Sequence, residues 1–239
     1  ALETLKQIED ESVHCIITSP PYWGLRDYGV EGQLGLESTP EEYVNNLVVV
    51  FREARRVLRR DGTLWLNVGD SYASNRAKST KSATATCVNT KLDVCAKTNK
   101  VVDGLKPKDL CMIPAEVAIA LRKDGWYLRS DIIWHKTNPM PESVKDRPTT
   151  AHEYVFLMSK NERYFYDNEA IREPLADSTI TRGKVDFGGK KGRNYTPKKG
   201  DPNYRDGSEQ WGRTYDYTIS SRGGRNKRSV WTVSTRPFP

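Results

Sequence analysis

Residues 18–23, Thr-Ser-Pro-Pro-Tyr-Trp, combine hydroxyl groups, two consecutive prolines and two aromatic rings. Each proline fixes φ at about −65° and lacks a backbone N–H, so this loop is stiff and presents carbonyl oxygens. The Ser19 hydroxyl and the Pro20 carbonyl are neighbouring hydrogen-bond acceptors, and the Tyr22 ring can stack on a flat group. The pattern indicates a rigid site for a flat ligand that carries hydrogen-bond donors. The alternative is a proline-stiffened turn whose aromatic residue packs in the core.

The elements around this loop favour a site over a plain turn. Residues 12–18 form an apolar, β-branched run that stops at the prolines, as a buried strand would. A helix of about 20 residues is expected from Pro40, with acids in its first turn and Gly62 after its end. The other predicted elements are strand 63–68, helix 110–123, strand 126–135 and strand 153–158. This alternation predicts a wound α/β sheet, whose ligands lie beyond the carboxyl ends of its strands.

Two stretches interrupt the alternation of strands and helices. Residues 74–104 are rich in Ser, Thr, Ala, Asn and Lys without a clear period, which predicts a loop insertion. Residues 177–228 contain 13 Lys and Arg against 6 Asp and Glu, an excess as large as that of the whole chain. Six aromatic residues are interleaved with these charges, which distinguishes the segment from a plain basic linker.

Composition sets the broad class of the protein. The chain has 239 residues, a net charge of +7 and a pI of about 9.1, which suits a partner made of phosphates. No apolar run is long enough to span a bilayer and no signal peptide opens the chain, so we expect a cytoplasmic location. The 4 cysteines lack C-x-x-C spacing and no His/Glu spacing suggests a ligand set, so no metal site is indicated.

The proline-rich loop resembles the catalytic loop of the β-type amino-methylating DNA methyltransferases, whose pattern is Ser, Asp or Asn, then Pro-Pro, then an aromatic residue. Further segments resemble successive motifs of the same family in the right order. They include RVLRRDGTLWLNVGDSY, IPAEVAIALRKDGWYLRSDIIWHKTN and PMPESVKDRPTTAHEYVFLMSKNERYFYDN. The likeness runs from Ala1 to about Asn168 and resumes at KRSVWT, residues 227–232. It is specific in the loop and supportive elsewhere.

The resemblance implies a Rossmann-like fold that uses S-adenosylmethionine and carries an inserted target-recognition region. It implies methyl transfer to an exocyclic amino group of a base that has been flipped out of double-stranded DNA. Ser in the first motif position is commoner among cytosine-N4 enzymes, and Asp or Asn among adenine-N6 enzymes. We therefore expect cytosine N4, with adenine N6 as the alternative. Cys15 lies in the strand and not in the loop, so covalent attack by cysteine on a ring carbon has no candidate.

The site residues carry over by position. Ser19, Pro20, Pro21 and Tyr22 are expected to be catalytic, and Thr18, Ser19 and Asp70 to contact the cofactor. The residues expected to contact DNA are Trp23 in the loop and, in the basic aromatic segment, Arg193, Tyr195, Arg205, Trp211, Arg213, Arg222 and Arg225.

One motif of the family is missing from the chain. The glycine-rich cofactor loop, Asp-Pro-Phe-x-Gly-x-Gly after a strand, is absent, and in the β-type order it follows a segment resembling SVWTVSTRPFP. We therefore predict a catalytic core at residues 1–176, a target-recognition region at 177–228, and at 229–239 the start of a segment leading to a C-terminal cofactor-binding half.

Several interpretations remain open at the level of sequence. A second chain that supplies the cofactor loop is a candidate partner, as is a restriction endonuclease in a restriction-modification system. A non-catalytic DNA-binding fragment and a protein glutamine methyltransferase with an Asn-Pro-Pro-Tyr type of loop are the alternative functions. The basic aromatic segment favours nucleic acid over protein as the substrate.

Overall fold

The structure, a computed structural model, describes residues 2–73, 104–176 and 224–234. The chain divides into two compact units, one formed by residues 1–165 and 229–239 and the other by residues 166–228. The first unit contains all the named helices and strands. The division of the chain into domains stays a prediction.

The first unit alternates strands and helices as the sequence predicts. In chain order its elements are α1 (Leu2–Lys6), β1 (Val13–Thr18), α2 (Pro40–Val57), β2 (Leu58–Val68), α3 (Ile113–Lys123), β3 (Tyr127–Lys136), β4 (His152–Ser159) and β5 (Val230–Val233). The α/β class is therefore confirmed.

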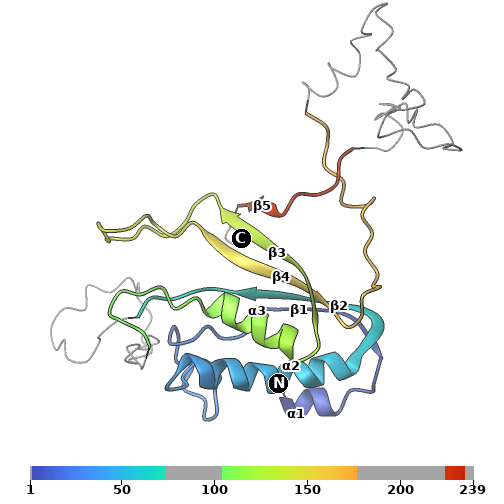
Figure 1. The fold of residues 1–239 in the computed structure, drawn as a ribbon, viewed down its shortest axis with the longest axis horizontal. Coiled ribbons are helices and arrows are strands. Elements are labelled where there is room, and N and C mark those ends of the chain that lie inside the picture. Colours follow the sequence, from blue (N-terminus) through green and yellow to red (C-terminus); the bar gives the residue numbers. More distant parts are fainter. Residues whose placement is uncertain (1, 74–103, 177–223, 235–239) are drawn as a thin grey trace, which may run out of the picture. The chain divides into compact units, whose positions relative to one another are not determined.

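The strands form one mixed sheet in the order β1-β2-β4-β3-β5 (Figure 1). β1 lies parallel to β2, and β5 lies parallel to β3. β4 is antiparallel to both of its neighbours, β2 and β3. As a result, the ends of β1, β2 and β3 and the beginning of β4 meet at one edge of the sheet. This edge is where the chain carries the Ser-Pro-Pro-Tyr loop.

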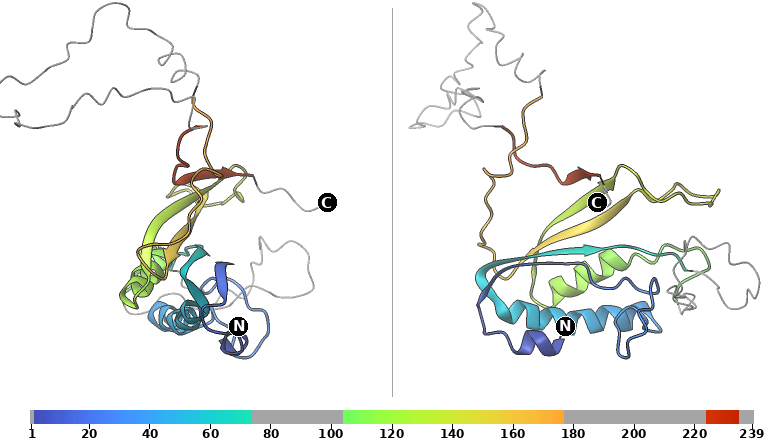
Figure 2. Two further views of the ribbon diagram at one scale, coloured as in Figure 1. Left: turned by 90° about the vertical axis from the view of Figure 1, so that its right-hand side faces the viewer. Right: turned by 180° about the vertical axis from the view of Figure 1, so that it is seen from behind.

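The core lies between the sheet and two helices. Figures 1 and 2 show α2 and α3 on the same side of the sheet. Leu64, Leu66 and Val68 of β2 are fully buried there, in one cluster with Leu47 of α2 and Leu121 of α3. Because side chains alternate along a strand, the intervening residues of β2 lie on the opposite face of the sheet. One strand therefore serves both the core and a second surface.

Helix α2 has a well-formed start. The Thr39 hydroxyl accepts a hydrogen bond from the Glu42 N–H at 3.2 Å, and Pro40 occupies the first turn. Both features are typical of helix N-termini, because a hydroxyl satisfies an otherwise unpaired N–H and proline has none to satisfy. The start at Pro40 is as predicted.

The end of α2 differs from the prediction. The helix stops at Val57, and β2 begins at Leu58, five residues before the predicted strand start at Thr63. Leu58 is fully buried and pairs with Val13 of β1. Arg59 and Arg60 point into solvent, and exposed arginines suit a strand as well as a last helical turn. Tertiary pairing therefore overrides the helical pattern of these residues.

Candidate active site

The ends of four strands bring polar side chains together at one edge of the sheet. Ser19 follows β1, Asn67 lies near the end of β2, Lys136 ends β3 and Glu153 lies near the start of β4. The pairing of Val68 with Tyr154 and of Trp134 with Glu153 fixes this arrangement. Alternation along the strands puts Asn67 and Glu153 on the face opposite Leu66 and Val68. The site is therefore set by the register of the sheet.

The Tyr22 hydroxyl is the centre of the site. Its oxygen lies 2.9 Å from Asn67 Oδ1 and 2.9 Å from Glu153 Oε2. Ser19 Oγ lies 3.3 Å from the Tyr22 hydroxyl and 3.3 Å from Asn67 Oδ1. The proline loop is thus tied to β2 and β4 through side chains.

Two glycines make room for the loop. A Cβ at Gly69 would lie 2.4 Å from Cε2 of the Tyr22 ring, closer than real Cβ contacts occur. A Cβ at Gly35 would lie 2.9 Å from the Tyr22 carbonyl oxygen, and Gly35 has a φ of +94°. Any side chain at Gly69 would displace the ring, and any at Gly35 would also strain the backbone. Gly69 therefore fixes how closely the ring packs on the end of β2.

Glu153 is ionised in this environment. Burial by itself favours the neutral acid, but hydrogen bonds from Lys136 and Tyr22 outweigh it, and the pKa of Glu153 is lowered from its ordinary value. Lys136 Nζ forms an ion pair with Glu153 Oε1. Burial, followed by the negative charge of Glu153, raises the pKa of Tyr22, so Tyr22 remains a neutral phenol that carries its proton.

The orientation of Asn67 follows from its second contact. Asn67 Nδ2 donates to the Tyr154 carbonyl oxygen at 3.0 Å. A flipped amide would place two acceptors against each other there, because a carbonyl oxygen only accepts. Asn67 Oδ1 therefore faces Tyr22 and Ser19 as an acceptor.

The residues predicted to be catalytic, Ser19 to Tyr22, directly follow β1, and their catalytic role stays a prediction. Ser19 is exposed, and Pro20, Pro21 and Tyr22 are half-buried. Tyr43 of α2 donates its hydroxyl proton to the Pro21 carbonyl at 2.8 Å. Within the part of the chain that the structure describes, the Pro20 carbonyl accepts no hydrogen bond. The Ser19 hydroxyl and the Pro20 carbonyl are therefore both available to a ligand.

Trp23 does not contribute to a surface. Its side chain is 1% exposed and belongs to the core, and its Nε1–H donates to the Glu37 carbonyl at 2.9 Å. The prediction that Trp23 contacts DNA is therefore wrong, because both the ring and its one polar atom are occupied inside the fold. Trp23 instead packs in the core, which was the alternative interpretation for an aromatic residue of this loop.

Asp70 has a structural partner. Its Oδ1 accepts from the Ser71 N–H at 2.8 Å and from the Ile113 N–H, the first of α3, at 3.1 Å. The residue at the N-cap position, Met112, has a φ of 56° and its side chain caps nothing. Asp70 supplies the cap from the end of β2 and places a negative charge where the helix dipole favours one. A contact of Asp70 or Thr18 with a cofactor stays a prediction.

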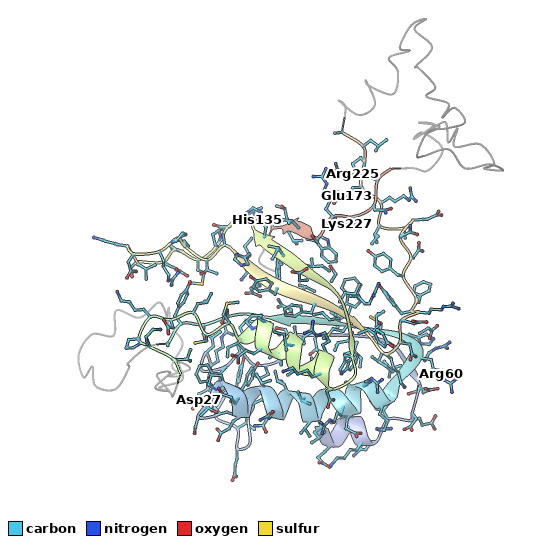
Figure 3. All side chains as sticks on the ribbon, in the orientation of Figure 1. Asp27, Arg60, His135, Glu173, Arg225 and Lys227 are labelled. Atoms are coloured by element: carbon cyan, nitrogen blue, oxygen red, sulfur yellow. The ribbon has the colours of Figure 1, made fainter. Side chains whose placement is uncertain are left out.

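Most residues predicted to contact DNA lie outside the described residues. They are Arg193, Tyr195, Arg205, Trp211, Arg213 and Arg222, and the predicted loop insertion falls outside as well, except for Gly104. Arg225 is described and belongs to the second unit. Its Nε lies 3.2 Å from Glu173 Oε2, and Lys227 Nζ lies 3.2 Å from Glu173 Oε1 (Figure 3). A carboxylate therefore offsets part of the positive charge near Arg225.

Three polar residues that lie around Tyr22 were not identified from the sequence, namely Asn67, Lys136 and Glu153. Asn67 and Glu153 are polar residues near an end of a mostly apolar strand, in TLWLNV and HEYVFLM, and Lys136 directly follows the predicted strand 126–135. A polar group at the end of a predicted buried strand is a usable signal, since buried polar groups need partners. That signal could have singled out the residues but not their common partner.

The described residues show neither a membrane-spanning helix nor a metal site. None of the helices is both long and apolar enough to cross a bilayer. No group of three or more His, Cys, Asp and Glu side chains is placed to hold a metal ion in the described part of the chain.

Comparison with known proteins gives consistent similarities. A family model described as DNA methylase, for N6 and N4 methyltransferases, matches residues 13–235. The chain is 43% identical to the Type II methyltransferase M.Cfr9I of Citrobacter freundii and 44% identical to M.XycI of Xanthomonas campestris pv. cyanopsidis. Both alignments include 100% of this chain and 63% of the relative, so the chain spans less than two thirds of the length of these proteins.

A solved structure is similar over part of its length. It is TTHA0409 of Thermus thermophilus, described as a DNA modification methylase and complexed with S-adenosyl-L-methionine. Its sequence identity is 24% and its TM-score 0.45, and the similarity covers 76% of this chain and 60% of that one.

The close packing of Tyr22 on Gly69 predicts that Gly69→Ala destabilises the protein. The added methyl group has no space, and overpacking of this kind typically costs about 1–3 kcal/mol. Denaturant unfolding of the variant measures the loss. Removing the ring should relieve the clash, so Gly69→Ala should cost much less in a Tyr22→Ala background. Equal costs in both backgrounds would show that the ring does not limit the space.

The cap on α3 predicts different effects for two changes at Asp70. Asp70→Ala should lower the free energy of unfolding by about 1 kcal/mol, because the first N–H of α3 loses its partner. Asp70→Asn keeps an acceptor oxygen and should retain most of that stability. Thermal unfolding of both variants tests this, and a loss in Asp70→Asn as large as in Asp70→Ala would contradict a capping role.

Proposed function

The chain belongs to the DNA methylase family, and on this premise we propose that it forms the catalytic side of a DNA methyltransferase. The proposed reaction transfers a methyl group from S-adenosylmethionine to an exocyclic amino group of a base in double-stranded DNA. The observation that carries the proposal is the loop itself. It presents two available acceptors, the Ser19 hydroxyl and the Pro20 carbonyl, next to a Tyr22 ring held by hydrogen bonds to β2 and β4.

The chemistry of an exocyclic amine requires such a pair of acceptors. The nitrogen shares its lone pair with the ring, so the amine is a poor nucleophile while it stays planar. Hydrogen bonds accepted from its two N–H groups draw it toward a tetrahedral shape and return the lone pair to the nitrogen. Ser19 Oγ and the Pro20 carbonyl oxygen are assigned these two bonds. The stiff backbone of Pro20 and Pro21 keeps the acceptors fixed, which matters because methyl transfer is an in-line displacement.

S-adenosylmethionine would supply an electrophilic methyl group at this site. Thr18 and Ser19 fit a role beside it, since they carry hydroxyls at the carboxyl end of β1, where ligands of α/β sheets bind. Asp70 fits less well in this chain, because Oδ1 of its carboxylate already caps α3. The sequence contains no Asp-Pro-Phe-x-Gly-x-Gly motif that could complete the set. The steps assigned to Ser19, Pro20 and Tyr22 do not depend on that loop.

Cytosine N4 is the proposed acceptor atom, with adenine N6 as the alternative. The support is Ser19 in the first position of the loop, which is commoner among the cytosine-N4 members of the family. A serine hydroxyl also differs chemically from the Asp or Asn of the adenine-N6 enzymes. Its oxygen carries a proton, which must point away from the substrate amine, whereas the side-chain oxygens of ionised Asp and of Asn carry none.

Nucleic acid is favoured over a protein side chain as the substrate. A glutamine side chain also has a planar amide that a Pro-Pro loop can bind. The net charge of +7, however, is matched by the excess in residues 177–228 alone, and six aromatic residues are interleaved with it. Phosphates attract the charge and bases stack on the rings. A role as a DNA-binding fragment without catalysis would leave the Tyr22 network unexplained.

Replacing Ser19 by Ala is expected to slow methyl transfer. Losing one fixed hydrogen bond in an active site typically lowers the rate on the order of 10²-fold or more. Duplex affinity should stay nearly unchanged, because the one contact proposed between Ser19 and the DNA is with the reacting amine. Single-turnover transfer from labelled S-adenosylmethionine in the intact protein measures the rate, and mass analysis of the product base identifies the atom.

The product also decides between the two amino groups. N4-methylcytosine supports the proposal made from Ser19, and N6-methyladenine selects the alternative. Undiminished transfer by the Ser19→Ala variant would show that the loop is not the catalytic element.

The basic aromatic segment is expected to bind DNA phosphates. Each lost phosphate contact lowers the slope of log affinity against log salt by roughly 0.9. The double variant Arg205→Gln, Arg213→Gln should therefore bind the duplex less tightly and with a shallower slope. A matched control is Arg122→Gln, Lys123→Gln, which removes the same charge from the exposed end of α3. Equal changes in slope for both double variants would contradict specific phosphate contacts by the segment, and would show instead an effect of net charge.

A further inference from the structure

We propose that ionised Glu153, paired with Lys136, sets the direction of the hydrogen bonds around Tyr22 and thereby makes Ser19 an acceptor toward the substrate amine. Glu153 is a positioning residue in this proposal, since it acts through Tyr22 and does not touch the base. The inference rests on the proposed function and adds to it the group that prepares Ser19 for its role.

The Tyr22 hydroxyl has fewer protons to donate than it has acceptors nearby. Tyr22 has one hydroxyl proton and two acceptors at 2.9 Å, Asn67 Oδ1 and Glu153 Oε2. Glu153 is a carboxylate, because its contacts with Lys136 and Tyr22 outweigh its burial. A hydrogen bond to a charged acceptor is roughly twice as strong as one to a neutral acceptor. The Tyr22 proton therefore points to Glu153.

Asn67 Oδ1 then needs a different donor. Its amide cannot flip, because Nδ2 is held by the Tyr154 carbonyl at 3.0 Å. The remaining donor within reach is the Ser19 hydroxyl, 3.3 Å from Asn67 Oδ1 and 3.3 Å from the Tyr22 oxygen. Both of these atoms are acceptors once the Tyr22 proton is on the side of Glu153. The Ser19 proton is therefore directed into the protein.

The consequence appears on the exposed side of Ser19. A hydroxyl has one proton and two lone pairs, so a proton directed inward leaves both lone pairs for an outside donor. One of these lone pairs can accept the N–H that the proposed function assigns to Ser19, while the second N–H of the amine goes to the Pro20 carbonyl. If the Ser19 proton pointed outward instead, it would face an N–H of the substrate and oppose the reaction. The direction of the Ser19 hydroxyl proton thus decides whether Ser19 can accept a hydrogen bond from the substrate amine.

Lys136 holds Glu153 in its charged state. Its ammonium group forms an ion pair with Oε1, the oxygen that does not face Tyr22. The side chains of the pair are 26% and 17% exposed, so both charges are largely removed from water. A carboxylate in that position without its cation would tend to take up a proton and could then donate to Tyr22. The chain of hydrogen bonds would reverse.

The variant Glu153→Gln tests the proposal. Its carbonyl oxygen would face Lys136 and its amide N–H would donate to Tyr22, which sends the Tyr22 proton to Asn67 Oδ1. Ser19 then shares that oxygen with a second donor, so its proton is directed inward less strongly. The single-turnover rate should fall roughly ten-fold, which corresponds to one ordinary hydrogen bond. The Kd for the duplex should change little, and the thermal midpoint should fall, because the partly buried Lys136 loses its charged partner. Glu53→Gln is the matched control, since Glu53 is also a partly buried, ion-paired glutamate but lies on α2 beside Arg56.

A double variant separates orientation from simple support of the loop. If Glu153 acts through the Ser19 proton, Glu153→Gln should cost no more than about two-fold in a Ser19→Ala background, because variants of one network are not additive. Tyr22→Phe keeps the ring and leaves Asn67 to accept from Ser19, so it should retain more activity than Glu153→Gln. An undiminished rate in Glu153→Gln, or a full ten-fold loss in the Ser19→Ala background, would overturn the proposal. An undiminished rate in Ser19→Ala alone would instead defeat the proposed function.

Discussion

The two prolines after β1 remove the backbone donors at the point where the chain leaves the sheet. Two consecutive residues without N–H groups cannot join a backbone ladder, so side chains hold this part of the loop. Tyr22 does this on the strand side, through Asn67 and Glu153, and Tyr43 does it on the helix side, through the Pro21 carbonyl. The position of Ser19 depends on both attachments. The stiffness of the loop and the precision of the site thus have the same origin.

The polar groups that hold the loop are an unusual choice for stability alone. Removing an ion pair such as Lys136 and Glu153 from water costs free energy, and hydrophobic residues of similar size often stabilise a fold at least as well. The cost is tolerable here because each atom has a partner. Both Glu153 oxygens are bonded, as are Asn67 Oδ1 and Nδ2. A network satisfied in this way specifies one arrangement, which is what a site for in-line transfer needs.

The sequence allowed the elements and the catalytic loop to be predicted, but not the contacts that support the loop. The strand before Ser19 and the start of α2 at Pro40 depend on local signals, namely β-branched runs, prolines and a capping threonine. The junction of α2 and β2 depends on the pairing of Leu58 with Val13, 45 residues away in the chain, which no local pattern reports. The burial of Trp23 was missed for the same reason. Its hydrogen bond to the Glu37 carbonyl and its packing in the core are tertiary features.

The register of β2 links the fold to the chemistry. Leu64, Leu66 and Val68 fill the core, and Asn67 between them reaches Tyr22 on the other face. A slip of one residue would exchange the two faces, burying Asn67 among leucines and exposing the core residues to solvent. The hydrophobic core therefore penalises a one-residue slip, which would move Asn67 away from Tyr22. Gly69, one residue after the strand, lacks the side chain that would occupy the position of the Tyr22 ring. The same burial that stabilises the sheet thus fixes where the acceptors of the loop stand.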